Sequence, residues 1–462
     1  MLKSKQFAPV LEKIRDLVGK EHFNDTYEER LCYSYDATIE EAMPDAIVFP
    51  GTTEEVAQIM TWANQANLPV IPRGAGTGLS GGSLPVKGGL VLSLCRMNKI
   101  LEINERDFYV EAETGTITLK INEAVDAKGL MYPPDPSSMK TSTIGGNVAE
   151  NAGGLRGLKY GVTKDYVMGM EVVTPTGEIL KTGTKTVKTA TGYNLTQLFV
   201  GSEGTLGVIT KVVLKLIPAV EHKESVLAIF DDMNQAAQTV ADIIGAGIMP
   251  ATLEFLDHIT INAVEDFKNI GLPRDAGAIL LIETDGVKEA AIKEIQRVEE
   301  ICARNQAIRV QKAESEEERD SIWQARRSAL SALARVRPTT ILEDATVPRS
   351  RIPDMVRGVA DIAGKYDITI GNFGHAGDGN LHPTILTDQR DKEEFKRVEK
   401  AIDEIFELAL ELGGTISGEH GIGSAKARFL EREVGKSGMD VMRSVKNALD
   451  PNGILNPGKM ML

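Results

Sequence analysis

The spacing of hydrophobic and polar positions differs between the two halves of the chain. In the first half, short apolar runs alternate with glycine-rich stretches, which is typical of short strands joined by loops. A helix is predicted over residues 52–66, because Thr52 or Thr53 precedes acidic residues in a capping-box pattern and apolar residues follow at helical spacing. Strands are predicted at 45–50, 68–72, 89–94, 109–113 and 211–218, with a hairpin at Thr176-Gly177 inside 171–180.

Beyond residue 218 the apolar spacing becomes that of longer helices separated by strands. One of these helices opens with a capping box, Ser315 followed by Glu318. We therefore expect a first domain at 1–220, a separate α+β domain at 221–415 and a C-terminal segment at 416–462 that carries two helices. The expected helices are 233–246, 287–304, 315–336, 352–366 and 392–412, and the expected strands between them are 225–230, 278–284 and 368–373.

Charge and composition narrow the classes of function. The formal net charge is −14. A nucleic-acid-binding protein normally carries a basic surface, so the charge argues against nucleic-acid binding. No apolar run approaches the ~18 residues of a membrane span. The N-terminus alternates charged and apolar residues at helical spacing and lacks the apolar core of a signal peptide, so we expect an amphipathic surface helix in a cytoplasmic protein. Cys32, Cys95 and Cys302 are far apart, which predicts buried thiols and no metal or iron–sulfur cluster.

Three glycine-rich loops stand out in the first half, at 72–82, 133–154 and 201–210. The first contains G-x-G-x-G, but a turn and a strand follow it, whereas a Rossmann loop needs a helix there and an acidic residue about 20 positions on. It can instead form a nest of backbone N–H groups around a pyrophosphate, or a plain glycine turn. Three such loops together favour backbone laid along one extended ligand.

Two of the six histidines lie in G-H-A-G-D-G-N-L-H-P, residues 374–383. Asp378-Gly379 predicts a two-residue type I′ turn, which would place His375 opposite His382 on one side of a hairpin. Opposed residues have Cβ atoms about 4.5–5.5 Å apart, a spacing that suits two imidazoles on one cation. A wider turn would loosen this geometry, but the histidines would still flank one loop.

A carboxylate that could complete such a site occurs at T-I-S-G-E-H-G-I-G, residues 415–423. His375, His382 and Glu419 would form a set of two histidines and one carboxylate, a catalytic pattern for zinc, iron or manganese. His420 would then remain available. The alternative is two hydrogen-bonded histidines in a hairpin and an unrelated polar turn, and the presence of both motifs among only six histidines favours the metal.

The glycine loops, in this order, resemble the FAD-binding domain of the vanillyl-alcohol oxidase / p-cresol methylhydroxylase flavoprotein family. The later motifs resemble its D-2-hydroxyacid dehydrogenase branch, which includes D-lactate dehydrogenases and the glycolate oxidase D subunit. The resemblance covers about 40–462. It implies an α+β fold, with an FAD-binding domain of two α+β subdomains, an α+β substrate (cap) domain with an antiparallel sheet, and a C-terminal segment that returns to the FAD domain.

The resemblance also implies which residues hold FAD. Some relatives tether FAD covalently through a histidine in the first loop, and this loop has none, so we expect non-covalent FAD. The residues that match cofactor-binding positions are Pro72, Arg73, Gly74, Ala75, Gly76, Thr77, Gly78, Gly81, Asp135, Ser138, Ser142, Gly145, Gly146, Asn147, Glu203, Gly204, Gly207, Ile209 and Asn456.

The resemblance assigns roles to the polar residues of the second half. Family members carry a divalent metal on residues that match His375, His382 and Glu419, with His420 as general base. Arg326 matches the arginine that binds the substrate carboxylate, a role that suits its bidentate fork. Arg327 is the next candidate, and the alternative for both arginines is a solvated helix face. Trp323, one helical turn earlier, is expected in the core.

The implied reaction is oxidation of a small D-2-hydroxy acid, with D-lactate favoured. The 2-hydroxyglutarate enzymes of the branch have an asparagine and a lysine for the distal carboxylate, where this chain has Thr384 and Leu342. A glycolate oxidase subunit is the alternative. The electrons are expected to pass to a partner, an electron-transferring flavoprotein or an iron–sulfur subunit. Rival hypotheses are a flavin-free metallohydrolase and a non-catalytic subunit that only holds FAD.

Overall fold

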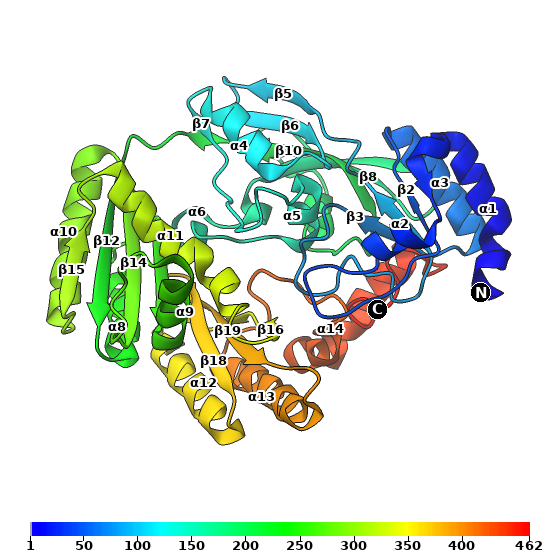
Figure 1. The fold of residues 1–462 in the computed structure, drawn as a ribbon. Helices are drawn as coiled ribbons and strands as arrows, with labels where there is room; N and C mark the ends of the chain where they lie inside the picture. The colour runs from blue at the N-terminus through cyan, green and yellow to red at the C-terminus, as the bar shows by residue number, and fades with distance from the viewer. Residues whose placement is uncertain (1) are drawn as a thin grey trace. The chain divides into compact units, whose positions relative to one another are not determined.

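The computed structural model describes residues 2–462 and divides into two compact units (Figure 1). The first unit contains the residues up to Ala152, Val162–Ala219 and Glu419–Leu462. The second contains Gly153–Gly161 and Val220–Gly418. The chain therefore leaves the first unit twice, once for the nine-residue segment Gly153–Gly161 and once for the long central segment.

The first sheet of the first unit has the strand order β1-β2-β4-β3, with β2, β4 and β3 parallel. Helix α3 begins as predicted, because the Thr52 side chain accepts a hydrogen bond from the Glu55 N–H, and it ends at Asn67 in the left-handed region. The N-terminal helix α1 buries an apolar stripe at Phe7, Val10 and Ile14, which confirms its amphipathic pattern. The elements are α1 (Leu2–Val18), β1 (Phe23–Asn24), α2 (Tyr27–Cys32), β2 (Ala46–Val48), α3 (Thr53–Ala66), β3 (Val70–Arg73) and β4 (Leu90–Ser93).

The second sheet of this unit is antiparallel, with the order β5-β6-β10-β8-β9. The predicted hairpin at Thr176-Gly177 joins β8 to β9, where Val173 pairs with Ile179. Two α+β subdomains thus make up the first unit, as expected. The elements are β5 (Ile100–Asn104), β6 (Tyr109–Glu113), α4 (Thr118–Asp126), β7 (Leu130–Met131), α5 (Ile144–Glu150), β8 (Val167–Val173), β9 (Ile179–Gly183), α7 (Leu195–Phe199), β10 (Val208–Lys215), β11 (Ile217–Pro218) and α14 (Ala427–Leu449).

The C-terminal segment is packed into the first unit by buried polar groups. Helix α14 is broken at Gly435, where φ is 69°, so the two helices predicted here are present. Near its end, Lys446 Nζ lies 2.5 Å from Asp450 and donates to the backbone oxygens of Thr205 and Leu455, each at 2.7 Å. Because Thr205 belongs to the third glycine loop, this buried ion pair ties the end of the chain to that loop.

The second unit is built on an antiparallel sheet with the order β15-β12-β14-β13-β18-β19-β16, and β17 also pairs with β19. This is the antiparallel sheet expected of the second domain. Its strands are β12 (His222–Phe230), β13 (Thr252–Asp257), β14 (Ala278–Gly286), β15 (Arg309–Lys312), β16 (Thr339–Leu342), β17 (Ala345–Thr346), β18 (Thr369–His375) and β19 (Asn380–Thr387).

Helices cover both faces of this sheet (Figure 1). Side chains of α8, α10, α12 and α13 pack with Phe255 on one face, and those of α9 and α11 pack with Leu256 and Phe373 on the other. Segment Gly153–Gly161 is held to the sheet by Lys159 Nζ, 2.5 Å from Asp285. The helices are α6 (Gly157–Tyr160), α8 (Met233–Gly245), α9 (His258–Lys268), α10 (Lys288–Arg304), α11 (Glu316–Leu333), α12 (Ile352–Tyr366) and α13 (Lys392–Glu411).

The hairpin that carries the two histidines has a wider turn than predicted. His375 pairs with Asn380 and Phe373 pairs with His382, so four residues, 376–379, form the turn. Gly379 has φ 89°, but Asp378 does not have the positive φ that a type I′ turn requires. The predicted register is therefore wrong by two residues. Side chains alternate with a period of two along a strand, so the error leaves both histidines on the same face.

The structure also bears on the expectations about membrane spans and about the three cysteines. Within residues 2–462, no helix combines the length and apolar character needed to cross a membrane. Cys302 is buried as expected, but Cys32 is exposed and Cys95 is half-buried. The prediction of three buried thiols is therefore wrong at Cys32, which lies on the outward side of the last turn of α2.

We predict that Lys446→Met destabilises the first unit by about 3–5 kcal/mol, the usual cost of removing one partner of a buried ion pair. The cost arises because Asp450 is left charged and buried. Urea unfolding of the purified protein measures it. The double variant Lys446→Met/Asp450→Asn should regain part of the lost stability, and equal stability of Lys446→Met and wild type would contradict the assigned role.

Candidate active site

All residues predicted to hold FAD lie in the first unit. The first glycine loop connects β3 to β4 and is packed tightly against the second. A Cβ at Gly74 would lie 2.2 Å from Thr143 Oγ1, and Gly76 has φ 71°. Larger residues would therefore clash at the first position and strain the backbone at the second. The glycines are required for the conformation of the loop.

Arg73, at the end of β3, supplies a buried positive charge next to this loop. Its Nη2 donates to the Tyr35 backbone oxygen at 2.7 Å, and its guanidinium lies over the Tyr33 ring. Burial lowers the pKa of Arg73, and the Asp36 charge opposes that effect. Nη1 is buried and has no hydrogen-bond partner within the described part of the chain. A buried guanidinium whose Nη1 can still donate a hydrogen bond is suited to bind an anionic group such as a pyrophosphate.

Each glycine loop also contributes a buried hydroxyl to this unit. Ser80, Ser142 and Ser202 are at most 6% exposed, and within residues 6–462 their Oγ atoms have no hydrogen-bond partner. Buried polar atoms are normally hydrogen-bonded, so three such hydroxyls, one in each loop, indicate a polar ligand. The loops therefore fit a phosphate- and ribose-containing cofactor.

Two of the predicted FAD residues have side chains that bond to other loops. The Glu203 carboxylate accepts hydrogen bonds from the Ile422 and Gly423 N–H groups at 2.7 and 2.6 Å. Asn456 Nδ2 donates to the backbone oxygens of Gly82 and Glu203 at 2.8 and 2.7 Å. These side chains fix the first and third loops to the C-terminal segment. Direct contact of either side chain with FAD stays a prediction.

In the second unit, the polar residues form a row on the sheet face that α9 and α11 cover. Phe255 pairs with Gly374 and Leu256 with Phe373, so one step further along these strands Glu254 faces His375. On the other side of β18, Phe373 pairs with His382. Glu254, His375 and His382 therefore come from three adjacent strands and point to one face.

Glu254 is fully buried and bonded to two cation-forming side chains. His375 Nδ1 lies 2.7 Å from one carboxylate oxygen, and Arg326 Nε donates to the other. Burial alone raises the pKa of Glu254, but His375 and Arg326 outweigh it and hold the pKa below its usual value. A carboxylate can only accept hydrogen bonds, so His375 donates through Nδ1, and in the neutral imidazole Nε2 carries the lone pair. This is the usual arrangement of a histidine that binds a metal.

The structure distinguishes the two candidate arginines. Arg326, on α11, is buried, and its guanidinium carbon lies 4.7 Å from the centre of the Phe373 ring. Arg327 is exposed and donates to the Asp320 backbone oxygen. Trp323 packs in the core beneath the same helix, as expected. Only Arg326 lies with the histidines.

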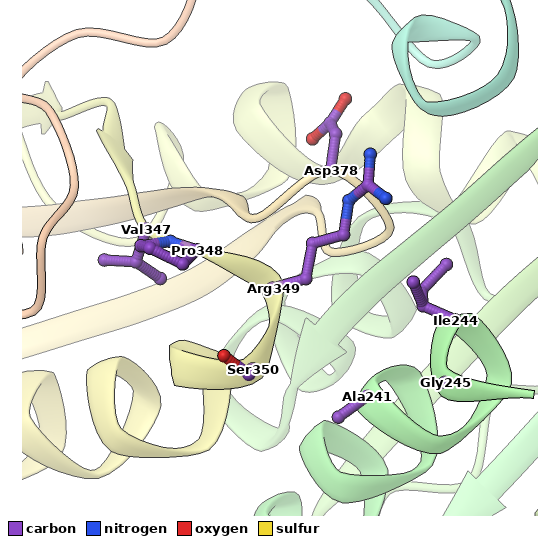
Figure 2. Close-up of a pocket in the computed structure, with 8 residues that line it drawn as sticks. All are labelled: Ala241, Ile244, Gly245, Val347, Pro348, Arg349, Ser350 and Asp378. Atoms are coloured by element: carbon purple, nitrogen blue, oxygen red, sulfur yellow. The ribbon is translucent and has the colours of Figure 1, made fainter.

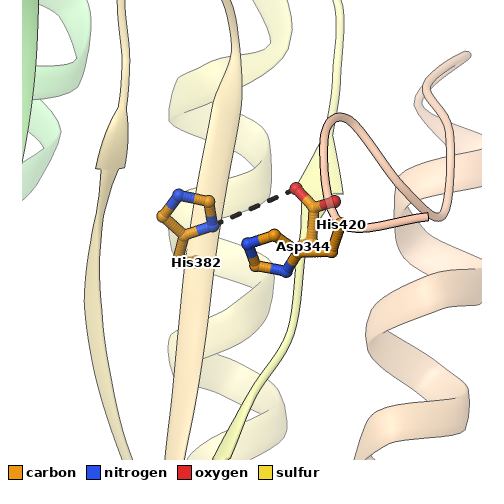
Figure 3. Close-up of side chains that lie close together, drawn as sticks. All are labelled: Asp344, His382 and His420. Carbon is orange, nitrogen blue, oxygen red and sulfur yellow. Dashed lines mark ion pairs between the residues drawn. The ribbon is translucent and has the colours of Figure 1, made fainter. Parts of the chain in front are cut away.

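His382 sits beside both His375 and a second buried carboxylate. The rings of His375 and His382 have centroids 5.2 Å apart. Asp344 Oδ1 lies 4.0 Å from His382 Nδ1, the pair joined by the dashed line in Figure 3. The other oxygen of Asp344 accepts a hydrogen bond from Ser417 Oγ at 2.9 Å. Imidazole and carboxylate groups are ligand types that suit a divalent cation such as zinc, iron or manganese.

Glu419 and His420 belong to the first unit, where His420 Nε2 lies 3.8 Å from Glu419 Oε1. The residue before them, Gly418, ends the second unit and is packed against β17 and the first residue of β19, the second strand of the histidine hairpin. A Cβ on Gly418 would lie 2.2 Å from Thr346 Oγ1 and 2.9 Å from Asn380 Nδ2. Glu419 is the next residue, so its Cα lies about 3.8 Å from the Cα of Gly418. Its participation in a metal site stays a prediction.

The sequence analysis missed Glu254 and Asp344. Glu254 lies inside the strand pattern T-L-E-F-L-D, Asp344 lies in T-I-L-E-D-A between β16 and β17, and both are fully buried. A charge is rarely buried without a partner, so an acidic residue within an apolar strand was the available signal. The missing information was which strands are neighbours.

A separate pocket of about 490 Å³ lies in the second unit (Figure 2). It contains none of the residues predicted for the active site. Its walls come from α8, the segment after β17 and the hairpin turn. The lining residues are Ala241, Ile244, Gly245, Val347, Pro348, Arg349, Ser350 and Asp378.

Comparison with known proteins places this geometry in a family. Residues 219–460 match the model for the C-terminal domain of FAD linked oxidases, and residues 44–183 match the model for an FAD binding domain. The chain belongs to the FAD-linked oxidase family. This FAD-linked oxidase therefore carries the cofactor domain that the three glycine loops predicted, and the expectation of an oxidoreductase is confirmed at that level.

Two kinds of relatives are similar to this oxidase over nearly its whole length. It is 56% identical to the glycolate oxidase subunit GlcD of Bacillus subtilis, over 98% of this chain and 96% of the relative, and 41% identical to the Escherichia coli protein of that name, over 97% and 90%. It is 38% identical to the D-lactate dehydrogenase of Anaerostipes hadrus, over 99% and 96%.

Solved structures confirm the expected fold. The oxidase aligns with p-cresol methylhydroxylase with a TM-score of 0.80 at 17% identity, over 99% of this chain and 97% of the other. It aligns with 4-ethylphenol oxidase from Gulosibacter chungangensis with a TM-score of 0.79 at 22% identity, over 99% and 97%. At these identities the likeness concerns the fold alone.

We predict that FAD is bound without a covalent link, because the first loop, 72–82, contains no histidine to tether it. Acid precipitation of the purified yellow protein should release the chromophore into the supernatant. Absorbance of the two fractions measures the partition. Colour that stays with the pellet would mean that another residue forms a covalent bond to the flavin.

Proposed function

We propose that this FAD-linked oxidase uses a divalent metal to oxidise a small 2-hydroxymonocarboxylate to the 2-keto acid. The observation that carries the proposal is the pair His375 and His382, with ring centroids 5.2 Å apart and Nδ1 of His375 held by a buried carboxylate. That hydrogen bond orients a metal ligand. We infer a site of His375, His382 and Glu419 for zinc, iron or manganese, with Asp344 nearby.

The residues of the sheet face favour a short substrate. Leu342 and Thr384 are direct cross-strand partners, and Thr384 Oγ1 is hydrogen-bonded to the His382 backbone oxygen at 3.0 Å. Neither side chain offers a charge for a second carboxylate. D-lactate was favoured from the sequence, and the higher identity to a glycolate oxidase subunit puts glycolate first. We therefore propose glycolate as the first substrate and D-lactate as the second.

The proposed chemistry assigns one task to each residue. Arg326 binds the substrate carboxylate through its Nη atoms, since Nε is bonded to Glu254. His420 accepts the substrate hydroxyl proton as general base. A metal held by His375, His382 and Glu419 would supply Lewis-acid chemistry that lowers the pKa of that hydroxyl. FAD held by the glycine loops would supply an acceptor for the hydride of the substrate carbon.

The electrons are proposed to leave through a partner protein. Both GlcD relatives are named as subunits of glycolate oxidase, which supports assembly with other chains. The three cysteines, Cys32, Cys95 and Cys302, are far apart in the sequence and provide no cluster-binding motif. An electron-transferring flavoprotein or an iron–sulfur subunit in the cytoplasm would accept the electrons.

The proposal is tested by anaerobic bleaching of the flavin. Purified protein loaded with FAD and metal should lose its flavin absorbance with glycolate or D-lactate. L-lactate and D-2-hydroxyglutarate should act much more slowly, the latter because Leu342 and Thr384 offer no charged partner. Bleaching by none of these acids would contradict the proposed reaction and favour a subunit that only holds FAD. Colourless protein that cannot be loaded would favour a flavin-free metalloenzyme.

A pair of variants separates metal ligand from base at the adjacent residues Glu419 and His420. Glu419→Gln should lose metal and activity, because a neutral amide is a poor replacement for an anionic ligand. His420→Asn should keep metal and FAD but lose about 10²–10⁴-fold in the rate of flavin bleaching, the usual contribution of a general base. Elemental analysis and single-turnover kinetics measure the two effects. The assignment is falsified if His420→Asn is metal-free while Glu419→Gln retains metal.

A further inference from the structure

We propose that Glu254 is the positioning residue of this site, and that its one carboxylate aligns both the metal ligand His375 and the substrate-binding Arg326. The inference rests on the proposed function, because it assumes that these two residues bind metal and substrate. No sequence motif marks Glu254, which lies in the middle of β13.

The two oxygens of Glu254 have separate partners. One lies 2.7 Å from His375 Nδ1 and the other accepts from Arg326 Nε, and the Glu254 side chain is fully buried. The two partners come from different elements, His375 from β18 and Arg326 from α11. Glu254 therefore joins the sheet to the helix that covers it.

The bond to His375 selects the ring nitrogen that can take a metal. Because Nδ1–H is donated to the carboxylate, Nε2 is the nitrogen that holds the lone pair of the neutral ring, and the ring cannot rotate without breaking the bond. Removal of such a partner typically weakens metal binding about 10- to 100-fold.

The bond from Arg326 Nε to Glu254 holds the guanidinium in one orientation. Glu254 bonds to Nε, which leaves the two Nη groups as the fork that can meet a carboxylate end-on. The guanidinium carbon lies 4.7 Å from the centre of the Phe373 ring, and that ring is 5.4 Å from the His382 ring. Glu254, His375, Arg326, Phe373 and His382 thus form one packed group.

A carboxylate is required because both partners are donors. His375 Nδ1–H and Arg326 Nε–H each need an acceptor, and a carboxylate offers two oxygens. Glutamine offers one oxygen and an NH₂ group, so Glu254→Gln must leave one of the two donors facing another donor. Aspartate keeps the charge, but its side chain is one methylene shorter and cannot reach both partners. The position therefore requires glutamate.

The experiment compares Glu254→Gln and Glu254→Asp with two matched variants. Glu265→Gln also removes a buried carboxylate, one that accepts hydrogen bonds from the backbone N–H groups of residues 270–272. Arg326→Ala removes only the substrate half of the group, and Arg327→Ala is its exposed control. Chelator-treated, FAD-loaded protein is titrated with Zn²⁺, with Mn²⁺ or, without oxygen, with Fe²⁺, and KM and kcat for glycolate are measured after metal is restored.

The expected result is a defect in both functions for the Glu254 variants alone. They should bind metal about 10- to 100-fold more weakly and show a raised KM for glycolate, with unchanged FAD content. Arg326→Ala should lower kcat/KM about 10- to 150-fold, as the loss of a charge-assisted hydrogen bond does, and keep wild-type metal affinity. Glu265→Gln should lose stability only, and Arg327→Ala should behave as wild type.

The outcomes separate this inference from the proposed function. Wild-type protein that binds none of Zn²⁺, Mn²⁺ and Fe²⁺ would overturn the proposed metal site and the inference with it. Wild-type protein that binds metal while both Glu254 variants bind it equally well would overturn the inference alone. If Glu254→Gln does not fold, Glu254→Asp, which keeps the buried charge, gives the same comparison. A Glu265→Gln variant with the same metal defect would show that any lost buried carboxylate produces it.

Discussion

The arrangement of the second unit's polar residues depends on one buried carboxylate between two cation-forming side chains. A fully buried Glu254 would be costly alone, and it is stabilised because His375 and Arg326 each bond to one of its oxygens. Its lowered pKa means that these partners outweigh the effect of burial. Glu254 is therefore the common partner: one of its oxygens holds His375 and the other holds Arg326.

The first unit uses buried charge in another way. Lys446 and Lys459 are nearly fully buried, and they donate to backbone oxygens of Thr205 and Leu84, in or next to the third and first glycine loops. Burial lowers the pKa of Lys459 to about 8. A loop of glycines has few side chains to hold it, and glycine loses the most conformational entropy when it is fixed. The lysines, with Asn456, supply the hydrogen bonds that the loops themselves lack.

The elements of the fold could be predicted where local rules decide them. The start of α3 at Thr52 and of α11 at Ser315 follow from capping, which involves residues only three positions apart. The hairpin of His375 and His382 was correct in its face and wrong in its register, because a turn's length depends on the packing around it. Gly377 shows this packing, since a Cβ there would lie 2.5 Å from Leu158, more than two hundred positions away.

Some site residues could be found from the sequence alone, and others required knowledge of the strand order. Histidines and glycines are conspicuous in a sequence, whereas Glu254 and Asp344 resemble any acidic residue until the neighbouring strands are known. The fold alone would not reveal them either, because p-cresol methylhydroxylase shares the fold at 17% identity. A fold supports many chemistries, and the side chains on one sheet face decide which one is possible. Here that face carries Glu254, His375 and His382, helix α11 adds Arg326, and the hydrogen bonds of Glu254 fix the orientation of His375 and Arg326.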